Sequence, residues 1–142
     1  MKNIHQILNE KGRQVWCIGS AATVFDALAL MADKNVGALL VTDASGPVGL
    51  FSEREYARSV ILKGRASRDT PVREVMVHPI LCVTPDHLVE EAMALMTAHR
   101  VRHLPVIKGG EVLGIVSIGD LVKSVIDEQK FIIEQLEHYI TG

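Results

Sequence analysis

Hydrophobic positions along the chain follow an order that occurs twice. A short apolar run, an amphipathic segment, two apolar runs and a second amphipathic segment follow one another, which predicts the order β-α-β-β-α. In the first pass the predicted strands are 15–18, 38–42 and 48–51, with a tight turn at 44–47 between the last two. The first predicted helix carries Val24, Leu28 and Met31 at spacings of three and four, and the second begins near Ser52.

The second pass repeats this order. Residues 17–61 overlay 82–126 without a gap, with 14 identities among 45 positions, so the chain is a tandem duplication. The matching segments are 80–83, a helix with Val89, Met93 and Met96, 104–107, a Gly109-Gly110 turn, 112–116 and a helix from Ser117.

The pattern also predicts the boundaries. Residues 1–64 form a first unit with its N-terminal segment, 65–75 a linker with a short helix that Thr70 caps ahead of Pro71, 76–127 a second unit and 128–142 a C-terminal helix. The continuing apolar positions of that last helix, and Leu28, Met31, Met93 and Met96, predict surfaces that a second copy of the chain covers.

Composition excludes several classes of protein. Of 142 residues 48% are hydrophobic and 23% charged, which excludes a disordered chain. A net charge of −2 and 4% aromatic residues argue against a nucleic-acid partner. No apolar run reaches the roughly 20 residues of a membrane helix. The N-terminus lacks a signal-like stretch, so we expect the cytoplasm. Cys17 and Cys82 are expected to be buried, reduced thiols.

Enzymatic chemistry has little support in the sequence. There is no glycine-rich phosphate loop of either common type, and no nucleophile, base and acid stand in a convincing arrangement. His99 and His103 do not share a helical face, which argues against a zinc site. We therefore expect no catalytic residues, no metal and no enzyme activity.

Two stretches carry a family resemblance. Each repeat has a glycine, two apolar residues and a serine, followed three residues later by an acidic residue, at 49–55 and 114–120. The second repeat also has a strand at 101–106, and residues 83–85 open its first helix. The chain resembles a pair of CBS domains, named for cystathionine β-synthase, of the stand-alone (Bateman module) kind. The resemblance implies an α/β fold in which two β-α-β-β-α units are related by a pseudo-two-fold axis, with AMP, ATP or a nicotinamide dinucleotide such as NAD(H) bound in the cleft between them.

The serine–acid motifs have two interpretations. Ser117-x-x-Asp120 and Ser52-x-x-Glu55 are both capping boxes, in which serine and acid satisfy backbone N–H groups at a helix start. The resemblance implies instead that Asp120 accepts hydrogen bonds from both ribose hydroxyls while Ser117 faces a phosphate. Glu55 is one methylene longer than the family's usual Asp, which weakens the first-repeat ribose contact.

Other positions are candidates in the same way. The resemblance directs Arg102 at the nucleotide phosphates, where a guanidinium donates in bidentate fashion, although a solvated basic turn is the alternative. Gly37 stands at the equivalent position and would admit an adenine face, while Thr84 is either an N-cap or a ligand contact. The full set of candidate ligand-binding residues is Ser20, Gly37, Ala38, Ser52, Arg54, Glu55, Thr84, Arg102, His103, Pro105, Ile115, Ser117 and Asp120.

The function implied by the resemblance is regulatory. The chain would sense an adenine nucleotide, with no obligatory cofactor, and would signal to a downstream protein by a change of shape or assembly as a homodimer. The alternative is a scaffold without a ligand that acts only through protein contacts.

Overall fold

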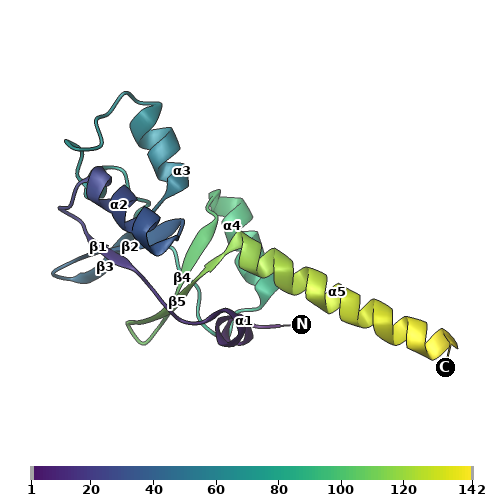
Figure 1. The fold of residues 1–142 in the computed structure, drawn as a ribbon. Coiled ribbons are helices and arrows are strands. Elements are labelled where there is room, and N and C mark those ends of the chain that lie inside the picture. The colour runs from purple at the N-terminus through teal and green to yellow at the C-terminus, as the bar shows by residue number, and fades with distance from the viewer. Residues whose placement is uncertain (1, 142) are drawn as a thin grey trace. The chain divides into compact units, whose positions relative to one another are not determined.

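The computed structural model describes residues 2–141 (Figure 1). It has the mixed α/β composition that the sequence predicts. Its elements are α1 (Ile4–Lys11), β1 (Cys17–Gly19), α2 (Val24–Lys34), β2 (Ala38–Asp43), β3 (Gly46–Ser52), α3 (Glu53–Glu55), the π-helix η1 (Tyr56–Ile61), the 3-10 helix η2 (Val72–Glu74), α4 (Val89–His99), β4 (His103–Lys108), β5 (Glu111–Ser117) and α5 (Ile118–Thr141).

The chain forms two compact units. The first-repeat unit is Val15–Leu81, and the second-repeat unit joins the segment up to Gln14 to the segment from Cys82 onward. This grouping differs from the expected division, which placed the N-terminal segment with the first repeat. The reason is direct backbone pairing, because Ile4 N–H donates to His87 O at 2.9 Å and Val89 N–H donates to Lys2 O at 3.1 Å.

The segment between the repeats plays the same part in the first-repeat unit as α1 does in the second. There Val24 N–H donates to Thr70 O at 2.9 Å, and Thr23 bridges Pro71 as Leu88 bridges Asn3. The apolar positions match in order: Ile4, Ile7 and Leu8 correspond to Val72, Val75 and Met76. Each repeat is therefore completed by a segment that lies outside it, in one case after it and in the other far ahead of it.

A glycine at the same repeat position admits each of these segments. A Cβ on Gly49 would lie 2.6 Å from Met76 Sδ and 2.7 Å from Val77 O, and a Cβ on Gly114 would lie 2.6 Å from Leu8 Cδ2. Since real Cβ atoms do not approach so closely, a side chain at Gly49 would push the Val77 backbone away, and a side chain at Gly114 would force the Leu8 side chain to move.

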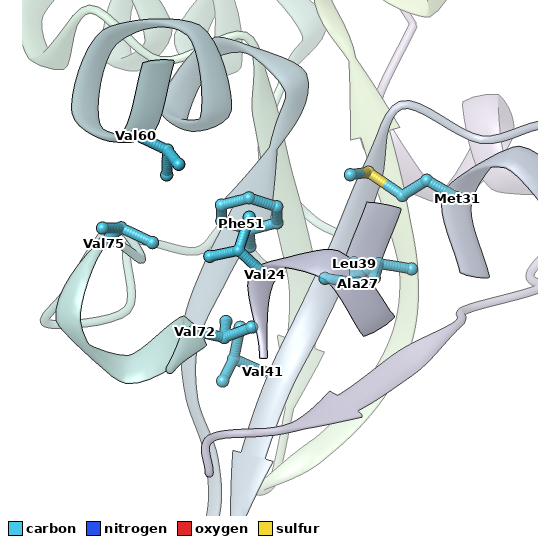
Figure 2. Packing of buried hydrophobic residues seen from close by; sticks show 9 residues of the cluster. All are labelled: Val24, Ala27, Met31, Leu39, Val41, Phe51, Val60, Val72 and Val75. Atoms are coloured by element: carbon cyan, nitrogen blue, oxygen red, sulfur yellow. The ribbon is translucent and has the colours of Figure 1, made fainter. Parts of the chain in front are cut away.

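The first-repeat sheet has the order β1-β2-β3, with β1 parallel and β3 antiparallel to β2. Its core lies where α2, the sheet, η1 and the η2 segment meet, with the Phe51 ring among aliphatic side chains (Figure 2). The buried cluster is Val24, Ala27, Met31, Leu39, Val41, Phe51, Val60, Val72 and Val75.

The second-repeat sheet contains only β4 and β5, in antiparallel register. The strand expected at 80–83 is reduced to one parallel bridge between Val83 and Val106. In the first repeat, Leu40 N–H donates to Trp16 O at 3.0 Å. The residue at the place of Leu40 is Pro105, which has no N–H, so the ladder cannot extend toward Leu81.

The second-repeat core repeats the first. Val89, Ala92 and Met96 on α4 are buried like their counterparts on α2. Met31 and Met96, expected on uncovered faces, are instead core residues, 4% and 2% exposed. The other buried apolar side chains of this unit are Ile4, Ile7, Leu8, Val83, Leu104, Val106, Val116 and Leu121.

Three local expectations are wrong. Cys17 is exposed and Cys82 only partly buried, because the short β1 leaves its end residues uncovered, although both thiols are free as expected. Thr70 does not cap a helix, since its hydroxyl donates to Ala66 O at 2.8 Å and the 3-10 turn begins later, at Val72. α4 begins at Val89 rather than at Pro85, as described below.

Helix α5 is the longest element. It begins at the end of β5 and continues past the rest of the second-repeat unit (Figure 1). Its last three turns leave large apolar side chains 50–86% exposed: Phe131, Ile132, Ile133, Leu136, Tyr139 and Ile140. No helix in the described part of the chain combines the length and apolar character needed to cross a membrane.

Candidate functional site

The candidate residues of the second repeat gather at the open end of the β4–β5 hairpin. His103 pairs with Ser117 and Pro105 with Ile115 in the antiparallel register. Ile118 N–H donates to Arg102 O at 2.9 Å, which fixes the chain entering β4 against the start of α5. The strand pairing therefore brings together residues that lie 14 and 10 positions apart in the sequence.

Thr84 joins this group through the loop ahead of α4. Val83 N–H donates to Pro105 O at 3.0 Å, which holds the neighbouring Thr84 beside β4. Thr84 is not a helix cap: its N–H donates to His87 Nδ1 at 2.9 Å, within a turn that precedes α4. The turn is held from outside, because His5 N–H donates to Pro85 O at 3.0 Å and so binds the loop to α1.

Ser117 and Asp120 form the predicted capping box at the start of α5. Ser117 N–H donates to Asp120 Oδ2 at 2.8 Å, and Asp120 N–H donates to Ser117 Oγ at 3.1 Å. The motif thus satisfies backbone donors as the capping interpretation requires. The Asp120 carboxylate remains partly exposed, at 25% of its side chain, so it is also accessible to a ligand.

A residue outside both repeats reaches the same carboxylate. Lys11, at the end of α1, donates from Nζ to Asp120 Oδ2 at 2.7 Å and to Ile115 O at 2.8 Å. Sequence reasoning missed Lys11 because it has no counterpart in the duplicated segments. The available signal was its spacing, since Ile7 and Lys11 lie one turn apart on the face of α1 that carries the buried Ile4 and Leu8.

The charges around this carboxylate shift two ionisation equilibria. Burial alone would raise the pKa of Asp120, but the hydrogen bonds from Lys11 and Ser117 and the ammonium charge hold this pKa below its usual value. The pKa of His103 is also lowered, first by burial and then by the charges of Lys11 and Arg102, against the opposing charge of Asp120. At neutral pH the group therefore presents an ionised carboxylate beside a neutral imidazole.

The first repeat contains the equivalent box with different surroundings. Ser52 N–H donates to Glu55 Oε1 at 2.9 Å, and the Ser52 hydroxyl donates to the same oxygen at 2.7 Å. Burial raises the pKa of Glu55, and the hydrogen bonds from Ser52 and the charges of Arg54 and Arg58 offset only part of this shift. No side-chain ammonium or guanidinium among the described residues forms an ion pair with Glu55.

The remaining first-repeat candidates are spread over this unit. Ala38 pairs with Ser52, and Glu53 N–H donates to Gly37 O at 3.1 Å, which matches the Ile118–Arg102 bond of the second repeat. Gly37 lines an open hollow of about 370 Å³ beside Leu28, Met31 and Val36 at the end of α2.

Ser20 and Arg54 hold their positions through backbone contacts. Ser20 lies after β1, where its N–H donates to Thr42 O at 2.8 Å and its carbonyl accepts from Arg73 N–H at 3.0 Å. Arg54 N–H donates to Ser52 Oγ at 3.3 Å. These contacts occupy the main chain of Ser20 and Arg54, and neither residue lines the Gly37 hollow.

The described residues include no group of three or more histidine, cysteine, aspartate or glutamate side chains placed to hold a metal ion. The second-repeat group offers a partly exposed carboxylate at a helix N-terminus, hydroxyls, an imidazole and an exposed arginine. Such groups suit hydrogen bonds to a diol and to anionic oxygens.

Comparisons with known proteins agree with this architecture. The CBS domain model matches residues 7–61 and 72–127. A solved CBS-domain protein from Burkholderia ambifaria MC40-6, named for a proposed role in signal transduction, is 47% identical with a TM-score of 0.85, over 90% of this chain and 96% of that one. The mitochondrial CBS domain-containing protein CBSX3 of Arabidopsis thaliana is 38% identical over 149 residues, which is 98% of this chain and 72% of the relative.

A third similar protein is named as an assembly. The hexameric CBS-CP12 protein from bloom-forming cyanobacteria is 31% identical with a TM-score of 0.78, over 86% of this chain and 70% of that one. Stand-alone CBS-domain proteins are typically regulatory, and CBS domains generally bind ligands. With one match on each repeat and the same order of strands and helices, the chain belongs to the CBS-domain family.

Proposed function

We propose that the chain is a regulatory module that binds an adenine nucleotide, AMP, ATP or NAD(H), at the second-repeat group. The observation that supports this most is the gathering of Thr84, His103, Ser117 and Asp120 around one hairpin end. An ionised carboxylate accepts two hydroxyl donors at once, which suits a ribose diol. The neighbouring helix N-terminus favours the phosphate.

Arg102 is the proposed phosphate residue. Its backbone is fixed by the hydrogen bond from Ile118, while its side chain is exposed and free to turn toward a ligand. The equivalent residue of the first repeat is Gly37, which offers no charge, so we propose that any site there takes a less phosphorylated ligand or none.

The test is calorimetric titration with AMP, ATP, NADH and S-adenosylmethionine, supported by thermal unfolding. A ligand at 100 times its Kd stabilises the folded chain by about 2.7 kcal/mol. Arg102→Ala should weaken di- and triphosphates by roughly 10-fold or more while leaving adenosine almost unchanged, because a charge-assisted hydrogen bond contributes about 1.5–3 kcal/mol. An equal loss for adenosine would place Arg102 away from the phosphates.

A second candidate function is a ligand-free scaffold. It is favoured by one observation, that the Ser117–Asp120 box already satisfies its backbone donors without a ligand. A scaffold would give no heat and no shift in Tm with any of the four ligands.

We also propose that the chain has no nucleic-acid or membrane partner, no catalytic activity and a cytoplasmic location. Fractionation of cells that express the chain would test the location.

We further propose a homodimer to which α5 contributes. Val122, Ile126, Ile133, Leu136 and Ile140 follow one another at spacings of 4, 7, 3 and 4, which at 3.6 residues per turn places them within an arc of about 80°. All five, here called the α5 stripe, are 40–80% exposed in the single chain. An apolar stripe without charge is self-complementary across a two-fold axis, and a second copy is therefore the proposed occupant.

A further inference from the structure

The Lys11 ammonium is already hydrogen-bonded to the Asp120 carboxylate, which the proposed function assigns to the ribose hydroxyls. Both donors that reach this carboxylate from outside its own residue, Lys11 and Ser117, do so at Oδ2. A vicinal diol needs both carboxylate oxygens, or one oxygen with room for two donors. Because Oδ2 already accepts two bonds, a ribose that places one hydroxyl on each carboxylate oxygen must replace the Lys11 bond.

Lys11 covers a second candidate contact as well. The same Nζ donates to the carbonyl of Ile115, so the ammonium is held at two points, 2.7 Å and 2.8 Å from its acceptors. Its stem belongs to α1, which is fixed to the unit by the buried Ile4, Ile7 and Leu8. The backbone that carries this ammonium is thus held in the folded unit, and only the lysine side chain has to move for the ammonium to leave Asp120.

A polar cavity beside this ion pair gives the ammonium a second position. It lies between α1 and α5, has a volume of about 70 Å³, and is lined by Asp120 and Lys11 together with Glu10, Lys123, Ser124, Asp127 and Ile7. Ser124 is 3% exposed, and among residues 2–141 its hydroxyl oxygen has no hydrogen-bond partner. A buried hydroxyl without a partner costs stability, so an incoming donor would gain this bond.

We propose that Lys11 is an affinity-setting residue that competes with the ribose for Asp120 and, when a nucleotide binds, turns into the α1–α5 cavity toward Ser124 and Asp127. This inference rests on the proposed function. It predicts that the ligand affinity is lowered by the free energy needed to displace the Lys11 ammonium from Asp120. It also predicts that the C-terminal end of α1 becomes more mobile when a nucleotide binds.

The test uses adenosine, which carries no phosphate, so that the loss of a positive charge does not itself weaken binding. Lys11→Met should bind adenosine about fivefold more tightly than the wild-type chain, as expected for removal of a half-exposed ion pair. Lys108→Met is the matched control: Lys108 belongs to the same unit but pairs with Asp86, at 4.0 Å, and does not line the cavity, so its loss should leave adenosine affinity unchanged. Lys11→Arg keeps the pairing and should behave as wild type.

The outcomes separate the two proposals. If the wild-type chain binds adenosine or AMP and Lys11→Met binds adenosine equally or more weakly, the competition is overturned while the proposed function stands. If no variant binds either ligand at millimolar concentration, the proposed function itself fails. Urea unfolding of each variant checks that it folds. A second readout is hydrogen exchange at 9–12, which AMP should accelerate in the wild-type chain and leave unchanged in Lys11→Met.

Discussion

The helical segments that end the two repeats begin with the same type of capping box, but they differ in length, in helix type and in the partner of the acidic residue. After Ser52 the chain forms three α-helical residues and a π-helix that ends at Ile61, whereas after Ser117 it forms a regular helix of 24 residues. Both acids are partly buried, but among residues 2–141 only Asp120 has an ammonium ion-pair partner, and Glu55 has none. The duplication supplied two similar capping boxes, with Glu55 in the first and Asp120 in the second, and a residue outside the repeats, Lys11, adds to the difference.

The source of this inequality is the segment that completes each unit. Lys11 follows Leu8 by three residues on α1, and the residue that follows Met76 by three is Pro79, which has no charge. The first-repeat box therefore has no counterpart of Lys11, because the equivalent position of its completing segment is a proline. A duplicated motif can thus acquire different surroundings from a segment that lies outside the repeat.

The largest expected effect concerns the difference in helix length. Truncation after Ile126 should convert a homodimer to a monomer, since it removes most of the α5 stripe. Ile133→Asp should do the same at micromolar concentration, whereas Phe131→Asp is the control, because Phe131 is equally exposed but lies on the opposite side of α5. Light scattering measures the mass. A monodisperse wild-type monomer would contradict the proposed dimer.

Ligand affinity tests whether the two boxes differ in function. Asp120→Ala should weaken AMP binding by about 10-fold or more, because charge-assisted hydrogen bonds contribute about 1.5–3 kcal/mol. Glu55→Ala should change the same Kd less than threefold. Calorimetry gives both values. Equal losses would mean that the two carboxylates contact ligand alike, and no loss for Asp120→Ala would favour the capping role alone.

Stability should respond in opposite directions to removal of the two charges. Asp120→Asn leaves an acceptor for Ser117 N–H but removes the anionic partner of Lys11, and should lower the free energy of unfolding by up to about 1 kcal/mol at pH 7. Glu55→Gln keeps an acceptor for Ser52 N–H and removes a partly buried charge, so it should leave stability equal or slightly higher.

Urea unfolding of the wild-type chain, Lys11→Met, Asp120→Asn and the double variant isolates the contribution of the Lys11–Asp120 pair. The destabilisation by Asp120→Asn should be largely absent when Lys11 is already methionine. A full loss in that background would show that the capping bonds, and not the lysine, carry the effect.

The smallest expected effects are in the dependence of stability on pH. The pKa of His103 is lowered in the folded chain, so protonation costs stability as the pH falls below the unfolded value of about 6.5. The counterpart of His103 in the first repeat is Ala38, which does not titrate. His103→Gln should therefore flatten the decline of unfolding free energy between pH 7 and pH 5.5.

The two acids should differ at lower pH. The lowered pKa of Asp120 contributes stability that is complete above its unfolded pKa of about 3.9 and is lost as the pH falls through the folded value. The raised pKa of Glu55 has the opposite sign, because its ionisation above about pH 4.3 opposes folding. Chemical unfolding between pH 3 and pH 6 of Asp120→Asn and Glu55→Gln would separate these contributions.

Much of the fold was predictable because the repeat doubles the signal. Two passes of the same apolar pattern fixed β2 to β5, both turns, α2 and both capping boxes within a few residues. The loss of the expected strand at 80–83 was not predictable from apolar residues alone. Pro105 on the neighbouring strand β4 has no N–H, and this missing donor limits the pairing to a single bridge. The start of α4 was misplaced because Thr84-Pro85 is an equally good turn.

The candidate site was predictable only in part. The resemblance and the strand register agree on the residues near Asp120, because pairing in a hairpin follows from its turn. The contact of Lys11 with Asp120 was not predictable, because no local sequence pattern indicates that α1 packs on the second repeat rather than on the first. The clue was the match of Ile4, Ile7 and Leu8 to Val72, Val75 and Met76, which is weak in sequence and clear only once both segments are seen packed.

The exchange of completing segments has a consequence for synthesis on the ribosome. The first-repeat unit has all its parts once residue 81 has emerged, but α1, made first, must wait for a partner 109 residues later. At about 5–20 residues per second, that interval is about 5–20 s. During it the apolar face of α1 is uncovered beside a unit that already holds its own equivalent, η2. The nascent chain therefore has a period in which α1 has no partner from its own unit, and a slow codon between residues 82 and 120 would lengthen it.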